Sequence, residues 1–83
     1  MGEFELFMKN PYWHGLYDSA PALVKKIYEI DWTYNSVETP KEKQEERLSI
    51  FKSFSDPDWQ FYISNCSNVQ AKTYYSNLRQ SFA

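Results

Sequence analysis

The sequence predicts an all-helical fold, a small bundle of three longer helices with two short helical pieces. Three observations support this prediction. Helix-start signals occur at several separate places, apolar residues recur with the period of an α-helix, and no segment alternates apolar and polar residues for long enough to indicate a strand. With 83 residues, the chain is expected to form one helical domain over residues 1–83.

The helix starts set the expected boundaries. A capping side chain followed by a proline or a capping-box partner satisfies the free N–H groups at the first turn of a helix. Such signals occur at Asn10-Pro11, Ser19 with Pro21, Thr39-Pro40, Asp56-Pro57 and Ser67-Asn68. They predict longer helices at about 20–34, 40–54 and 68–81, and shorter helical pieces near 11–17 and 57–65.

The first nine residues carry a weaker signal. Residues 3–9 fit either a short helix or an extended segment, and residues 1–9 are expected to be flexible or to include part of an expression leader at residues 1–4. Boundaries predicted in this way shift by a few residues in most structures.

The helix predicted at 20–34 has one clear core stripe, formed by Leu23, Ile27, Ile30 and Tyr34. Asp31 lies near the middle of this stripe, seven residues after Val24. Trp32 points away from the stripe, on the side that carries Lys25 and Glu29.

The apolar stripe of the helix at 40–54 contains Leu48, Phe51 and Phe54, and it also contains Arg47. A charged group on a core-facing stripe has to be paired, or to lie at its edge. The sequence therefore predicts a structural ion pair between Asp31 and Arg47, which would join the two helices.

The helix at 68–81 places its apolar side chains in one narrow arc, so it is expected to pack by an aromatic face. Its other side is polar, without an acidic residue, and follows the 57–65 helix after a short turn. Helix pairs of this kind also bind DNA. DNA binding is therefore the alternative function, through Lys72, Thr73, Ser76, Arg79 and Gln80.

Composition excludes most chemistry. One His, one Cys and two Gly residues cannot build a closed zinc site, a phosphate-binding loop or a supported catalytic triad. We therefore expect no enzyme activity, no cofactor and no metal. A net charge of −2 disfavours a broadly basic nucleic-acid binder. The lone Cys66 and the lack of an 18-residue apolar run predict a cytoplasmic protein with no membrane association.

Aromatic residues are in surplus, with 3 Trp, 7 Tyr and 6 Phe in so short a chain. Trp13, Trp32 and Phe61 do not all fit a three-helix core, and exposed rings often mark protein interfaces. The sequence thus predicts a small protein-binding module, a regulator, adaptor or inhibitor that contacts another protein or its own copy through these rings. The composition fits a bacterial or phage accessory protein. In the alternative, the N-terminal segment folds over the rings.

Overall fold

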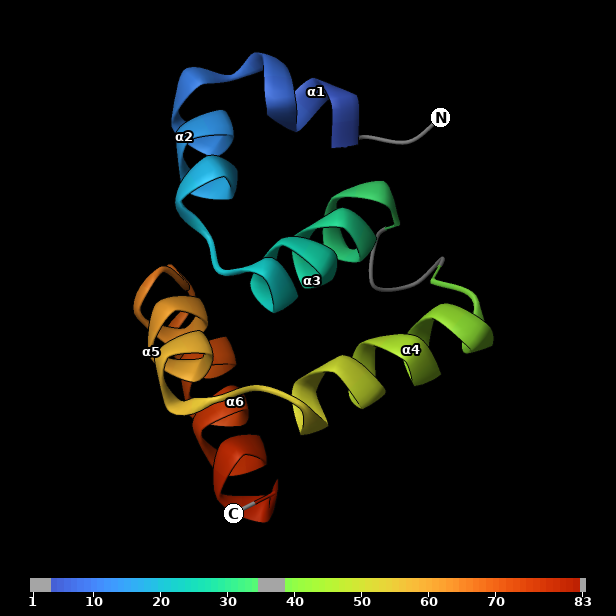
Figure 1. The fold of residues 1–83 in the computed structure, drawn as a ribbon, viewed down its shortest axis with the longest axis vertical. Helices are drawn as coiled ribbons and strands as arrows, with labels where there is room; N and C mark the ends of the chain where they lie inside the picture. The colour runs from blue at the N-terminus through green and yellow to red at the C-terminus, as the bar shows by residue number, and fades with distance from the viewer. Residues whose placement is uncertain (1–3, 35–38, 83) are drawn as a thin grey trace.

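The computed structural model describes residues 4–34 and 39–82, and these residues form helices without any strand. The all-helical prediction is confirmed. The helices, drawn in Figure 1, are α1 (Phe4–Lys9), α2 (Pro11–Ser19), α3 (Ala22–Thr33), α4 (Lys41–Lys52), α5 (Asp56–Ser64) and α6 (Val69–Phe82). Their ends differ by one to two residues from most of the predicted boundaries, and residues 1–3 lie outside the described part.

Two helix starts show how local capping sets the fold. At α2 the prediction is confirmed, because the Asn10 Oδ1 accepts a hydrogen bond from the Tyr12 N–H at 2.9 Å. At α5 the prediction is one residue late. Ser55, not Asp56, is the cap, and its N–H and Oγ both donate to the buried Asp58 carboxylate at 2.9 Å.

The starts of α4 and α6 are each shifted by one residue. Asn68 caps α6 in place of Ser67, since its Oδ1 accepts from the Ala71 N–H at 3.0 Å. Helix α4 begins after Pro40, which is extended with ψ at 151°. The Gln44 side chain reaches back and donates to the Thr39 carbonyl at 2.9 Å. The predicted Thr39 capping box is therefore replaced by a different local contact.

Helix α3 lies at the centre of the molecule and contacts α1, α2, α4 and α5, while α6 packs on α5 (Figure 1). Its Val24 and Ile27 side chains are fully enclosed, and Tyr28, Ile30 and Trp32 are buried as well. Because these residues point in several directions around the helix, α3 is covered on more than one side.

The prediction that Trp32 projects away from the core is wrong. Its side chain is only 7% exposed. Tyr28 stacks on it at 4.7 Å between ring centroids, and the N-terminal helices supply four further rings, those of Phe4, Phe7, Trp13 and Tyr17. The physical reason is that α1 and α2 fold over the second side of α3. This is the alternative in which the N-terminal segment covers the surplus rings.

A second aromatic cluster joins the C-terminal half. Phe51 of α4, at 1% exposure, stacks on Trp59 of α5 at 5.4 Å and lies 5.6 Å from the Tyr75 ring of α6. Tyr62 of α5 contacts both Phe51 and Tyr75 edge-on. These rings hold α4, α5 and α6 together at one point, and they therefore fix how α6 lies relative to α4.

Candidate binding groove

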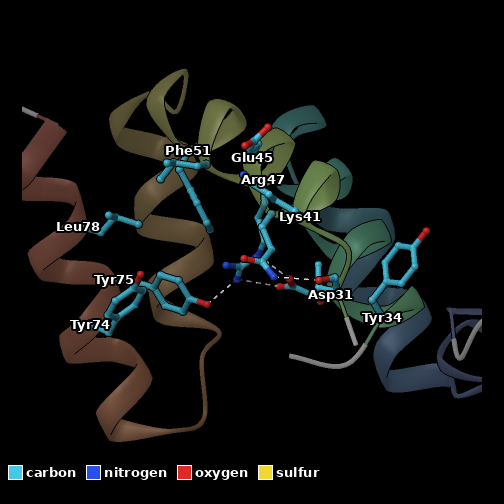
Figure 2. A pocket seen from close by; sticks show the side chains of 12 residues that line it. Asp31, Tyr34, Lys41, Glu45, Arg47, Phe51, Tyr74, Tyr75 and Leu78 are labelled. Atoms are coloured by element: carbon cyan, nitrogen blue, oxygen red, sulfur yellow. Dashed lines mark hydrogen bonds and ion pairs between the residues drawn. The ribbon is translucent and has the colours of Figure 1, made fainter. Parts of the chain in front are cut away.

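Helices α4 and α6 are not packed closely along their lengths, and they meet through a few long side chains. A groove with a volume of about 710 Å³ lies between them and reaches the C-terminal end of α3. Figure 2 shows α6 on one side of this groove and α3 with α4 on the other, with Arg47 between them. We call this hollow the α4–α6 groove.

The α4–α6 groove has a mixed lining, in which apolar and aromatic side chains lie beside charged and polar ones. Leu48 of α4 is 43% exposed and Tyr74 of α6 is 59% exposed, while Leu78 is partly buried and Phe51 is buried beneath them. The expectation that Leu48 belongs to the core stripe of its helix is wrong. Tyr75 of α6 reaches α4 at Phe51 and Arg47, and the described helices leave the intervening Leu48 43% exposed.

At the base of the groove, Arg47 makes the ion pair that the sequence predicts. Its Nε donates to Asp31 Oδ1 at 2.7 Å, and its Nη2 donates to Asp31 Oδ2 at 3.4 Å. The Arg47 Nη2 also donates to the hydroxyls of Tyr75, at 2.6 Å, and Tyr62, at 3.1 Å. The Tyr62 hydroxyl in turn donates to Asp31 Oδ2 at 2.9 Å. Four helices thus contribute to one network, and Figure 2 draws its Asp31, Arg47 and Tyr75 members.

Arg47 and Tyr62 keep fixed protonation states at neutral pH. Burial raises the pKa of the Tyr62 hydroxyl well above its ordinary value, and the Asp31 charge raises it further, against the opposite effect of Arg47. Desolvation tends to lower the pKa of Arg47, but the Asp31 carboxylate outweighs it and the Arg47 pKa is raised. Arg47 is therefore a permanent cation and Tyr62 a permanent hydroxyl donor. The Arg47 guanidinium also lies 4.9 Å from the Phe51 ring.

Local sequence patterns give little indication of these two hydroxyls. Tyr62 and Tyr75 lie on apolar stripes and have the appearance of ordinary core residues. The apolar arc predicted for this helix includes both Tyr74 and Tyr75. Only Tyr75 packs on Phe51 and Tyr62, and Tyr74 is 59% exposed, so the expected packing is wrong for Tyr74.

The three rings predicted to bind a partner do not form a shared exposed surface. Trp13 is partly buried and packs edge-on against Trp32 at 5.6 Å, and Phe61 is partly buried against the core. Trp32 itself is covered. The exposed large apolar side chains are instead Leu6, Tyr12, Leu48, Val69 and Tyr74. These five side chains are distributed over α1, α2, α4 and α6, and a partner-binding role for Trp13, Trp32 and Phe61 stays a prediction.

The residues of the DNA-binding alternative are divided between two environments. Lys72 and Thr73 are exposed, whereas Ser76, Arg79 and Gln80 line a depression between α5 and α6. Arg79 Nη2 lies 3.1 Å from Asp56 Oδ1, so its charge is paired. These observations do not favour DNA binding, which stays an untested prediction.

Within residues 4–34 and 39–82, no three His, Cys, Asp or Glu side chains gather closely enough to hold a metal ion. His14 is exposed and lies 3.2 Å from Asp18, and Cys66 is a partly buried free thiol. None of the described helices has both the length and the apolar character that crossing a membrane requires.

No family model matches the chain, and the comparisons with curated proteins and with solved structures find no match either. The α4–α6 groove offers exposed apolar side chains above the buried Phe51 ring, with the paired Arg47 guanidinium at its base.

Proposed function

We propose that the chain is a small, non-enzymatic protein-binding module that binds an apolar helix of a partner protein in the α4–α6 groove. The observation that carries the proposal is the exposure of Leu48 and Tyr74 on opposite sides of a groove floored by Phe51. Amphipathic helices bind such grooves by inserting apolar side chains spaced three, four or seven residues apart. Tyrosine is also among the residues that most often dominate binding energy at interfaces.

Full burial of a leucine side chain such as Leu48 contributes about 1.5–3 kcal/mol. Within this proposal the protein is a regulator, adaptor or inhibitor of bacterial or phage origin. A cytoplasmic location belongs to the proposal too, because the free thiol of Cys66 suits a reducing compartment.

The experiment is a selection of helix-forming peptides from a displayed random library, followed by affinity measurements on two variants. Leu48→Glu places a charge in the groove. Leu6→Glu makes the same change at a leucine of α1 that is 64% exposed and does not line the groove. Circular dichroism of both variants checks that they remain folded.

We expect the selected peptides to bind the wild type and Leu6→Glu with similar affinity, and Leu48→Glu at least about tenfold more weakly. A selection that yields no peptide with this dependence on Leu48 would contradict the proposal. Sedimentation of the pure protein tests a further outcome. A concentration-dependent dimer that is lost in Leu48→Glu would show that the occupant is a second copy of the chain.

A further inference from the structure

Among the residues that the structure describes, the Arg47 guanidinium has one donor nitrogen without a hydrogen-bond acceptor. Arginine carries five N–H groups on three nitrogens. Its Nε donates to Asp31, and its Nη2 donates to Asp31, Tyr62 and Tyr75. No acceptor for Nη1 occurs within residues 4–34 and 39–82.

This unused donor is open to solvent. Among the described residues, every buried side-chain nitrogen or oxygen has a hydrogen-bond partner, so an unpartnered Nη1 cannot be buried. Arg47 is only about a quarter exposed, and the hollow that it lines is the α4–α6 groove. A ligand that enters the groove can therefore reach Nη1.

The acceptors around Arg47 are already engaged. Asp31 Oδ1 accepts from Nε, and Asp31 Oδ2 accepts from Nη2 and from the Tyr62 hydroxyl. The carboxylate of Glu45 is the other acid lining the groove, and Glu45 is exposed. In the free protein water can accept from Nη1, and in a complex this acceptor would have to come from the bound ligand.

A partner that covered Arg47 with apolar groups alone would strip water from Nη1 and give no hydrogen bond in return, which is unfavourable. A carboxylate is the strongest acceptor for a guanidinium. The opposite side of the groove carries no competing negative charge, because α6 has no acidic residue, and Lys41 adds a cation to the lining.

We propose that the α4–α6 groove recognises an apolar helix carrying one Asp or Glu, whose carboxylate accepts a hydrogen bond from Arg47 Nη1. The apolar neighbours of this acid pack on Leu48 and Tyr74. This inference rests on the proposed function and adds the chemistry of the partner's central residue to it.

The test uses the peptides selected for binding that depends on Leu48. We expect them to share an acidic residue between apolar positions. Three synthetic versions of one peptide, with Glu, Gln or Lys at that position, are titrated against the wild-type protein. Loss of a charge-assisted hydrogen bond should weaken the Gln peptide roughly ten- to a hundredfold, and the Lys peptide further.

Two variants of the protein separate recognition from folding. Asp31→Asn keeps Arg47 and removes the nearest competing carboxylate, so the preference for Glu over Gln should increase. Arg47→Lys keeps the positive charge but removes the guanidinium fork, so this preference should decrease. Circular dichroism and urea unfolding show whether each variant is folded at the temperature of the titration.

The outcomes for the two proposals differ. Peptides that need Leu48 but bind equally well with Glu and Gln would overturn the carboxylate inference and leave the proposed function intact. An unchanged preference for Glu in both Asp31→Asn and Arg47→Lys would also overturn the inference, because the carboxylate would then be recognised elsewhere. A library that yields no peptide dependent on Leu48 would overturn both.

Discussion

The ion pair between Asp31 and Arg47 can be tested with a double-mutant cycle, using Asp31→Asn, Arg47→Met and the double variant. The pair joins α3 to α4, and Arg47 also binds the hydroxyls of Tyr62 and Tyr75. Arg47→Met keeps most of the side-chain volume and removes all of these hydrogen bonds. It leaves the Asp31 carboxylate with the Tyr62 hydroxyl as its remaining donor in the described residues.

The expected magnitudes follow from burial. Breaking a fully buried ion pair costs about 3–5 kcal/mol, whereas an exposed pair contributes about 0–1 kcal/mol. The side chains of Arg47 and Asp31 are 24% and 26% exposed, so we expect an intermediate loss of about 2–3 kcal/mol for Arg47→Met. Asp31→Asn should lower the free energy of unfolding by about 1–2 kcal/mol, since the amide oxygen can still accept a hydrogen bond from Arg47 Nε.

The double variant should lose less free energy of unfolding than the two single variants lose in sum, and the difference, the coupling energy, should be about 1–2 kcal/mol. Urea unfolding followed by tryptophan fluorescence gives the free energy of unfolding for each protein. A domain of this length has a total stability of only about 4–12 kcal/mol, so these losses are measurable. Additive losses, within about 0.3–0.5 kcal/mol, would refute the reasoning.

Three further predictions concern the rest of the fold. Trp32→Ala should cost about 3–5 kcal/mol in urea unfolding, because the ring is buried under α1 and α2, and a loss typical of a surface site would contradict this placement. Asp58→Asn should cost about 1–2 kcal/mol through the cap of α5, while the matched change Asp56→Asn, at an 89% exposed side chain, should leave stability nearly unchanged. Burial and the hydrogen bond to Glu29 raise the pKa of Tyr17 from 10.0 to about 12, and burial also raises that of Tyr62. Because the folded state holds these two protons more tightly than the unfolded state, their contribution to stability is complete below pH 10 and is lost as the pH rises through the raised pKa values. Tyrosinate absorbance and circular dichroism should therefore change together above pH 10. Titration of every tyrosine near pH 10 in the folded protein would contradict this prediction.

Local patterns predicted the helices because caps and periodicity are local properties. The Asn10 cap is where the sequence places it, and the Asp31 and Arg47 side chains meet as their positions on two core stripes suggested. The starts of α5 and α6 moved by one residue because a neighbouring polar side chain, Ser55 or Asn68, takes part in the capping instead. Helix α3 begins two residues later than predicted, after Pro21 and without a side-chain cap from Ser19. The choice between adjacent capping residues depends on backbone geometry that the sequence does not display.

Burial could not be predicted where it depends on docking between distant elements. Trp32 is covered by rings from α1 and α2, and no pattern within α3 records where those short helices pack. The converse holds for Leu48, which lies on an apolar stripe but is left open because α6 approaches α4 at Arg47 and Phe51. The groove results from this mode of packing, so it has no sequence motif of its own.

The most direct test of the central claim is to map the binding surface in solution. A selected peptide is added to the isotopically labelled protein, and backbone amide chemical shifts are followed by NMR. The account predicts that the largest changes occur in α4 and α6 around Leu48, Tyr74 and Leu78, and that they disappear in Leu48→Glu. Changes centred instead on the exposed Leu6 and Tyr12 of α1 and α2 would contradict it.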